Sequence, residues 1–436
     1  MASERKAPSG CFLIDTPVYN AAARSTVDRL PPGSLTDIIP AVPGFLFPLF
    51  LALLIDLPAI AAPFVPATDS QVLATVPARA TDPRAREMLT LRQAWLRAPQ
   101  DLDAAVAYAR RGFEEVAAEG DPRFVGHAQA ALKPWFSLPD PPVAVRVLRA
   151  QILQFDHQFS PALADLDAAL RAQPDLGDAW AWRTAILMVQ ADYSAARRSC
   201  DGMAPHASAL IAAACRAQVD AATGQSAAAA AALRAALAQQ PAASADARLW
   251  ALTRLAETEE RRGAFAAAEA AFRDALALGL PDVYLQAAYA DFLLDRGRPA
   301  EVLALLQDRG RADVLLLRLA LAAKAAGHAS APGHARALAA RFAAASQRGD
   351  ASHQKDESRF LLAIQGDAAR ALQLAQQNFA VQKEPADARI LMEAALAARQ
   401  PDAAQPALDW MAASGMQSVV LQALAGSLAG QLKGQR

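Results

Sequence analysis

Residues 210–241 read LIAAACRAQVDAATGQSAAAAAALRAALAQQP, and residues 249–280 read LWALTRLAETEERRGAFAAAEAAFRDALALGL. Each stretch holds two alanine-rich segments separated by one glycine, Gly224 in the first stretch and Gly263 in the second. Alanine is the best helix former, and glycine ends a helix where the backbone takes a positive φ. Each stretch therefore predicts two helices joined by a tight turn.

The same pattern recurs in blocks at 143–174, 177–203 and 283–306, at intervals of about 34 residues. Three kinds of position stay in register: a small residue in the first helix, a turn residue, and a small residue in the second helix. The small residues of the first helix are Ala150, Thr184, Ala217, Ala256 and Ala290. The turn residues are His157, Ala191, Gly224, Gly263, Gly297, Gly327 and Gly366. The small residues of the second helix are Ala162, Ala196, Ala229, Ala268 and Ala371.

The composition agrees with an all-helical chain. Alanine fills 112 of the 436 positions, and only 6% of the residues are aromatic. Alanine is depleted in β-strands, so a sheet is not expected, and the 54% hydrophobic content argues against disorder. A formal net charge of -1 lacks the basic excess of a nucleic-acid-binding protein, so we expect no nucleic-acid partner.

The repeated positions resemble the tetratricopeptide repeat (TPR), a helix–turn–helix unit of 34 residues. The resemblance implies an all-α fold, a right-handed α-solenoid of stacked helix–turn–helix (TPR-like) repeats. We expect irregular N-terminal helices over 84–142, regular repeats over 143–306 and degenerate repeats over 307–415. Residues 416–436 are predicted to form a capping helix at the end of the array.

The N-terminal region contains the apolar run FLFPLFLALLI at 45–55. A run of this length is typical of a secretory signal peptide, so we interpret 45–61 as a signal cleaved after Ala61. The alternatives are an uncleaved membrane anchor over 45–65 and a buried apolar segment. Residues 1–44 are an N-terminal extension of uncertain role, and the Pro- and Thr-containing stretch 62–83 is predicted to be a linker.

The chain shows none of the catalytic motifs HExxH, GxSxG, GxxxxGK[ST] or GxGxxG. We therefore expect no enzyme activity, no cofactor and no metal site. His328 and His334 flank one loop, but two histidines make an incomplete metal site. Glu257, Glu259 and Glu260 stand beside two arginines, and we interpret this cluster as a solvated helix face with internal ion pairs rather than an acid/base site.

Cys200 and Cys215 fall on the second helix of one repeat and the first helix of the next. Such helices pack together, so a disulfide is conceivable in an oxidising compartment. We favour two buried free thiols over that disulfide.

The concave face of a repeat array is its usual binding surface, and the first helix of each pair lines it. By the repeat pattern, this face also includes Asp178, Ala181, Met188, Gln218, Thr253, Arg261 and Asp295. The candidate partner-binding residues are Gln151, Gln154, Phe155, Arg183, Trp250, Glu257, Tyr284 and Asp291. Trp250 and Tyr284 are possible anchors, although we favour a packing role for them.

Arg149, Arg183 and Arg216 recur at spacings of 34 and 33, where the family pattern usually has leucine. A basic ladder for a carboxylate-bearing ligand is one interpretation. We favour a ladder of ion pairs between repeats, made with Asp165, Asp167 and their equivalents.

These observations predict a non-catalytic, exported scaffold or adaptor that binds a protein or peptide partner on its concave face. We expect it in the periplasm of the bacterial cell envelope, with contact to the membrane only through 45–65 if that segment stays uncleaved. The alternative is a structural subunit of an envelope complex, anchored in the inner membrane with a periplasmic solenoid. An enzyme with a site in the looser region 307–360 is a third hypothesis.

Overall fold

The computed structural model describes residues 82–349 and 353–435, and residues 88–435 belong to one compact unit. The described residues form helices and no β-strand, which confirms the all-α fold. The predicted extension 1–44, signal or anchor 45–61 and nearly all of the linker 62–83 lie outside the described residues. Within the described part, none of the helices is both long enough and apolar enough to cross a membrane.

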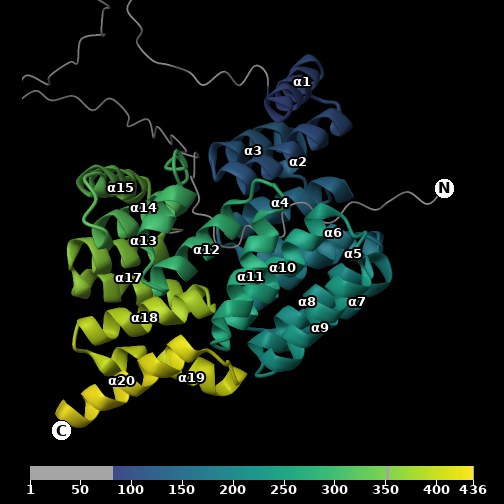
Figure 1. Cartoon of the computed structure of the whole chain (residues 1–436). Coiled ribbons are helices and arrows are strands. Elements are labelled where there is room, and N and C mark those ends of the chain that lie inside the picture. The colour runs from purple at the N-terminus through teal and green to yellow at the C-terminus, as the bar shows by residue number, and fades with distance from the viewer. Residues whose placement is uncertain (1–81, 350–352, 436) are drawn as a thin grey trace, which may run out of the picture. The chain divides into compact units, whose positions relative to one another are not determined.

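The helices follow one another as antiparallel pairs joined by short turns (Figure 1). The N-terminal helices are α1 (Pro83–Arg97), α2 (Leu102–Glu119) and α3 (Arg123–Phe136). The regular pairs are α4 (Val143–Phe155) with α5 (Phe159–Ala172), α6 (Gly177–Val189) with α7 (Tyr193–Met203), α8 (Ala209–Ala222) with α9 (Ser226–Gln239), α10 (Ala245–Arg261) with α11 (Phe265–Leu276), and α12 (Val283–Asp295) with α13 (Pro299–Leu305).

The later pairs contain π-helical and 3-10 turns. They are α14 (Asp313–Ala325) with α15 (Ala331–Gln347), α16 (Gln354–Phe360) with α17 (Ala368–Val381), and α18 (Pro385–Ala397) with α19 (Gln405–Ser414), followed by α20 (Val419–Gln435). A 3-10 turn, Ala204–His206, extends α7, a π-helical turn, Leu361–Gln365, extends α16, and a second 3-10 turn, Pro401–Ala404, precedes α19. The resulting TPR-like array confirms the resemblance seen in the repeated positions.

Small residues occupy the positions where the helices of each pair cross. Ala150, Ala217, Ala256 and Ala290 are at most 1% exposed, and Thr184 takes the same position at 3%. Because these side chains are short, the backbones approach closely, and larger side chains on the second helices fill the remaining space at the density of an ordinary core. A continuous hydrophobic core extends from Ala181 in α6 to Leu428 in α20.

The C-terminal part of the array folds back over the inner edge of the earlier hairpins. The backbone N–H of Lys383 donates to the carbonyl of Val189 at the end of α6, with N and O 2.8 Å apart. On α19, Trp410 Nε1 donates to the hydroxyl of Tyr193 at the start of α7 over 3.0 Å. We call residues 382–421, which make these contacts, the closing segment.

The closing segment lies against the turns of successive hairpins. Each of these turns has a residue with positive φ: His157 (55°), Ala191 (60°), Gly224 (81°) and Gly263 (79°). A Cβ atom on Gly224 would lie 3.0 Å from the carbonyl oxygen of Gly415, and one on Gly263 would lie 3.2 Å from a methyl carbon of Val419. Glycine therefore permits both the turn and the close approach. Where His157 replaces glycine, its Nε2 lies 3.2 Å from Nε2 of Gln382.

The helix predicted at the C-terminal end is α20. It packs against α18, as a cap over the last repeat would. Gly415, just before α20, lies against the turn of α8–α9, and Val419, the first residue of α20, lies against the turn of α10–α11. This part of the chain therefore also covers the inner edge of the array.

The preference for free thiols at Cys200 and Cys215 was wrong, because the two residues form a disulfide between α7 and α8. Both residues are fully buried, and their Cα atoms are 5.6 Å apart, within the range that a disulfide requires. The small side chains around them let the two helices come this close. The sequence places the cysteines on neighbouring helices but does not give the direction of their Cβ atoms.

Candidate functional site

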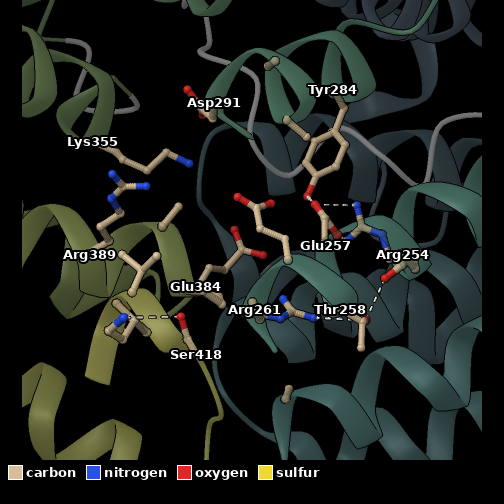
Figure 2. Close-up of a pocket in the computed structure, with 18 of the residues that line it drawn as sticks. Arg254, Glu257, Thr258, Arg261, Tyr284, Asp291, Lys355, Glu384, Arg389 and Ser418 are labelled. Carbon is tan, nitrogen blue, oxygen red and sulfur yellow. Dashed lines mark hydrogen bonds and ion pairs between the residues drawn. The ribbon is translucent and has the colours of Figure 1, made fainter. Parts of the chain in front are cut away.

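The inner helices surround a pocket with a volume of 220 Å³ (Figure 2). Helices α10, α12 and α18 supply most of its charged side chains, and the closing segment supplies the rim near Ser418. We call this space the inner pocket. Its basic residues are Arg254, Arg261, Arg318, Lys355, Lys383 and Arg389, and its acidic residues are Glu257, Glu260, Asp291, Asp295, Asp356 and Glu384.

Helical spacing explains why α10 presents several polar groups to the pocket. Arg254, Glu257, Thr258 and Arg261 lie three or four residues apart, so they share one face of the helix. Arg254 Nη1 lies 3.1 Å from Glu257 Oε2, and the Arg254 guanidinium lies 4.7 Å from the centre of the Tyr284 ring. The Tyr284 hydroxyl donates a hydrogen bond to Glu257. Burial raises the pKa of Tyr284, so its hydroxyl remains a donor at neutral pH.

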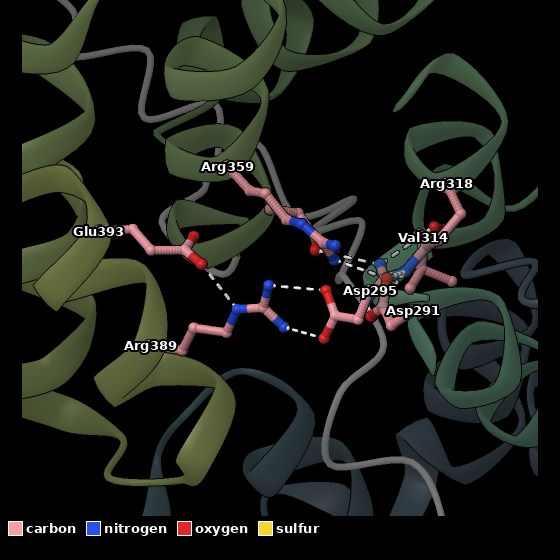
Figure 3. Close-up of polar contacts among 8 residues, drawn as sticks. Asp291, Asp295, Val314, Arg318, Arg359, Arg389 and Glu393 are labelled. Atoms are coloured by element: carbon pink, nitrogen blue, oxygen red, sulfur yellow. Dashed lines mark hydrogen bonds and ion pairs between the residues drawn. The ribbon is translucent and has the colours of Figure 1, made fainter. Parts of the chain in front are cut away.

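A second group of charges connects α12 to the later repeats (Figure 3). Asp291 accepts from Arg318 Nη2 over 2.6 Å and from Arg359 Nη1 over 2.7 Å. Burial alone would raise the pKa of Asp291, but these two guanidinium groups hold it at about 2. Arg389 makes two hydrogen bonds of 2.6 and 2.8 Å to Asp295. These pairs fix α12 against α14, α16 and α18.

Glu260 and Glu384 differ from the other pocket carboxylates, because neither forms an ion pair with any described residue. Burial, with Asp295, Glu257 and Asp291 nearby, raises the pKa of Glu260 to about 8, and Arg261 offsets this only in part. Burial, with Asp387 nearby, raises the pKa of Glu384 to about 7. At neutral pH both groups are therefore partly or largely protonated.

Arg254 and Arg261 each have a buried Nε with no hydrogen-bond partner among the described residues. Arg261 Nη2 reaches only Thr258 Oγ1, at 3.4 Å. The inner pocket therefore has two carboxyl groups without an ionic partner and two guanidinium groups whose hydrogen bonds are incomplete.

Three of the predicted partner-binding residues, Glu257, Tyr284 and Asp291, come together at this pocket. Met188, Gln218, Arg261 and Asp295, also predicted for the concave face, line it as well. The partner-binding role of all of these residues stays a prediction.

The other predicted site residues lie elsewhere. Gln151, Gln154 and Phe155 on α4 are at most 5% exposed, and Phe155 belongs to the core around α2–α6. Trp250 is 5% exposed and packs in the main core, as the favoured packing role implies. Arg183 forms an ion pair with Asp167 at 2.7 Å, away from the inner pocket.

The ladder of ion pairs between repeats is confirmed for Arg183 and Arg216, and Arg149 instead pairs within its own hairpin. Arg149 Nε lies 2.6 Å from Asp165 Oδ2, Arg183 Nε lies 2.7 Å from Asp167 Oδ1, and Arg216 Nε lies 3.0 Å from Asp201 Oδ1. Each arginine is on the first helix of a hairpin. Asp167 and Asp201 are on the second helix of the hairpin before it, whereas Asp165 is on the second helix of the same hairpin as Arg149. At Arg183 and Arg216 the departure from the leucine of the family pattern therefore connects successive repeats, and at Arg149 it connects the two helices of one repeat.

The prediction of a solvated acidic face on α10 was wrong. Glu259 is 1% exposed and pairs with Arg234 and with Arg262, the latter at 2.7 Å. Glu257 and Glu260 lie on the wall of the inner pocket. The internal ion pair between Glu259 and Arg262 agrees with the prediction. The low exposure of these glutamates disagrees with the prediction, because side chains from other helices cover them and this could not be seen in the local sequence pattern.

Sequence reasoning also missed the residues that the later repeats bring to the pocket. Glu384 and Arg389 reach it only because the closing segment returns to the inner face, and Lys355 reaches it from α16. Their helices gave weak repeat signals, and no local pattern marks them as facing α10. Among the described residues, no group of three or more His, Cys, Asp or Glu side chains could hold a metal ion, and His328 Nδ1 lies 2.8 Å from Ser330 Oγ.

Glu260 predicts a pH dependence of stability. Its folded pKa of about 8 exceeds the value of about 4.3 for an unfolded glutamate. The folded chain therefore holds an extra proton between these values, and stability falls as the pH rises through this range. Between about pH 5 and about pH 9, the free energy of unfolding should fall in both the wild type and Glu260→Gln. We expect the fall to be smaller in Glu260→Gln, by on the order of 2 kcal/mol.

The measurement is urea unfolding across that pH range, followed by circular dichroism. Glu301→Gln is the matched control, because Glu301 is exposed and pairs with Arg298 outside the pocket. The control should follow the wild-type profile. If Glu260→Gln loses stability in parallel with the wild type, Glu260 does not titrate as a buried group.

No protein-family model and no curated protein matches the chain. Among solved structures, it is similar to a tetratricopeptide repeat protein from Parabacteroides merdae, with 12% identity, 71% of this chain and 98% of that chain covered, and a TM-score of 0.34. It is also similar to the Cut9–Hcn1 hetero-tetramer of the APC/C, with 13% identity, 79% and 66% of the two chains covered, and a TM-score of 0.48. For the human IFIT1 dimer with m7Gppp-AAAA, the identity is 11%, the coverage 81% and 86%, and the TM-score 0.42.

At these identities and TM-scores, the likenesses carry no argument about function. The assignment of the chain as an all-α array of TPR-like hairpins rests on its own repeated positions and observed helix pairs.

Proposed function

We propose that this chain is a non-catalytic scaffold or adaptor that binds a protein or peptide partner at the inner pocket. The observation that carries the proposal is the pair of carboxyl groups, Glu260 and Glu384, that have no ionic partner in a pocket where the other acids do. In the same pocket, Nε of Arg254 and Nε of Arg261 are buried without a hydrogen-bond partner among the described residues, and such exceptions indicate a place for a ligand.

The size of the pocket supports a peptide group rather than a large cofactor. Its volume of 220 Å³ is below the range of about 300–1,000 Å³ that is usual for drug-sized ligands. One residue of a partner chain would occupy it, and the remaining contacts would lie on the exposed rim around Ala386. The near-neutral charge of the chain supports a protein partner over a nucleic acid.

We propose that the other charged residues of the pocket have a structural role and not a catalytic one. Asp291 and Asp295 are held by arginines from three other helices, and Glu257 is held by Arg254 and Tyr284. These contacts maintain the walls of the pocket.

The proposed location is an oxidising compartment, which agrees with the predicted signal peptide at 45–61 and with an exported or periplasmic protein. The disulfide between Cys200 and Cys215 supports it, because such bonds are rare in proteins of the reducing cytosol.

Thiol alkylation tests the location. Bacterial cells that make the full chain are quenched in acid, and the denatured protein is treated with a maleimide, either directly or after reduction. We expect Cys200 and Cys215 to be labelled only after reduction. Labelling of both residues without reductant would contradict an oxidising compartment.

Site-specific photo-crosslinking tests binding of a partner of any identity. A benzophenone amino acid is introduced at Ala386, an exposed residue at the pocket, and in a control variant at Ala228, an exposed residue of α9. We expect irradiated cells to give a discrete cross-linked product from position 386 and none from 228. A product of equal intensity from both positions, or none from 386, would contradict binding at the inner pocket.

A further inference from the structure

A second pocket, with a volume of 330 Å³, lies between α5, α6 and α7 and shares no residue with the inner pocket. We call it the arginine pocket. It is lined by Asp167, Leu170 and Arg171 on α5, Trp180 and Arg183 on α6, and Arg198 on α7. These residues carry three positive charges and one negative charge, in a chain whose formal net charge is -1. The local surplus of positive charge favours a negatively charged ligand.

The three arginines differ in the partners that they already have. Arg183 Nε lies 2.7 Å from Asp167 Oδ1. Arg198 Nη1 donates to the hydroxyl of Ser194 over 2.7 Å, and the Arg198 guanidinium has no carboxylate partner among the described residues. Arg171 has neither a hydrogen bond nor an ion pair with any described residue. Both Arg171 and Arg198 are exposed, so each can receive a carboxylate from outside the chain.

Other repeats have alanine in place of both arginines. Arg198 stands two positions after the small residue of a second helix, and the equivalent residues elsewhere are Ala164, Ala231 and Ala270. Arg171 directly follows the Ala-Leu pair near the end of a second helix, and the equivalent residues elsewhere are Ala238 and Ala277. The packing of the repeats therefore does not require arginine at these positions, and the two arginines add charge to this pocket alone.

Trp180 supplies an apolar surface to the same pocket. Its indole N–H donates to the carbonyl of Pro174 over 2.8 Å, so its one polar group is already satisfied. Its ring packs on the backbone of Gly202, where a Cβ atom would lie 2.6 Å from Trp180 Cη2. The exposed part of the indole therefore offers a ligand an apolar contact. Tryptophan and arginine are the side chains that most often dominate the energy of protein–protein interfaces.

We infer that the arginine pocket binds an acidic segment of a partner protein, in which two carboxylate side chains stand on either side of an apolar one. The inference rests on the proposed function only in taking a protein as the partner. Helices α5 and α7 both pack against α6. An extended segment can therefore place one carboxylate at Arg171, the apolar side chain at Trp180 and the other carboxylate at Arg198.

Other anions fit this pocket less well. A nucleic acid gains its affinity from many phosphate contacts along a basic surface, whereas here the positive surplus is confined to one small pocket. An inorganic phosphate ion would match the charge but would leave Trp180 without an apolar partner. Two separate carboxylates match the two arginines that lack one, and the side chain between them uses the indole.

Calorimetric titration of the full chain tests the inference with peptides whose two ends are blocked. The acidic probe is acetyl-Glu-Ser-Leu-Ser-Glu-amide, in which alternation puts both carboxylates and the leucine on one side of an extended segment. We expect it to bind, and replacement of both acidic residues by glutamine to weaken binding at least about tenfold. Replacement of the leucine by serine should weaken binding about fivefold, because the contact with Trp180 is lost.

Two variants connect the binding to the named arginines. Arg171→Ala and Arg198→Ala should each weaken binding of the acidic probe about tenfold, because each removes a charge-assisted contact. Arg336→Ala is the matched control, since Arg336 on α15 is an exposed arginine with no ion pair to any described residue, and it should bind as the wild type does. Circular dichroism should show unchanged helical content, because alanine takes the equivalent positions in other repeats.

Every other result overturns the inference. Equal binding of the glutamine peptide shows that charge does not select the ligand, and tighter binding of a ten-residue oligothymidylate shows a nucleic-acid site. Binding that is the same in both arginine variants places the peptide elsewhere, and no binding at millimolar concentration removes the acidic ligand. The peptide comparisons use the wild-type chain, so they decide the question whatever the stability of the variants.

The cross-link at Ala386 separates this inference from the proposed function, because Ala386 lies at the inner pocket. If that cross-link persists while the acidic probe fails to bind, the proposed function stands and only the acidic segment is wrong. If neither is observed, both fail.

Discussion

The contact between the closing segment and the hairpin turns determines what the rest of the array can do. An open stack of TPR-like hairpins exposes a broad concave face. Here residues 382–421 lie against the turns at His157, Ala191, Gly224 and Gly263, and the concave face becomes a pocket. The contact depends on backbone proximity, since Gly415 approaches Gly224 too closely for a Cβ atom to be placed there without a shift.

This closure also explains the electrostatics of the site. It brings carboxyl and guanidinium groups from distant repeats to the walls of one pocket. Most of them pair, and the pairs of Asp291 with Arg318 and of Asp295 with Arg389 hold α12 against the later helices. Glu260 and Glu384 stay without ionic partners, and burial raises the pKa of both. The walls of the pocket are therefore held by ion pairs, while Nε of Arg254 and Nε of Arg261 stay without a hydrogen-bond partner among the described residues.

Much of the fold could be predicted from the sequence, because it depends on local signals. The helix pairs from α4 to α13 follow from alanine at the crossing positions and from the turn residues. The ion pairs between repeats follow from the recurring arginines at Arg183 and Arg216, whereas Arg149 pairs within its own hairpin. The pocket could be predicted only in part. Glu257, Tyr284 and Asp291 follow from the inner face of each hairpin, whereas Glu384 depends on where a distant segment returns.

The burial of the acidic cluster on α10 also could not be predicted from the local sequence. The Glu257–Glu260 cluster has the pattern of a solvated helix face, and only the closing segment and the neighbouring helices make it a pocket wall. The disulfide between Cys200 and Cys215 likewise depends on side-chain directions between repeats.

The most direct test of this account is the distance between Gln225 and Gln417, exposed residues that flank the contact between Gly224 and Gly415. With Cys11 replaced by serine, cysteines at the two positions carry spin labels, and electron resonance measures the distance between them. The account predicts one narrow distribution at short distance, unchanged by salt. A broad or long distribution would show that the closing segment leaves the hairpin turns and that the concave face is open.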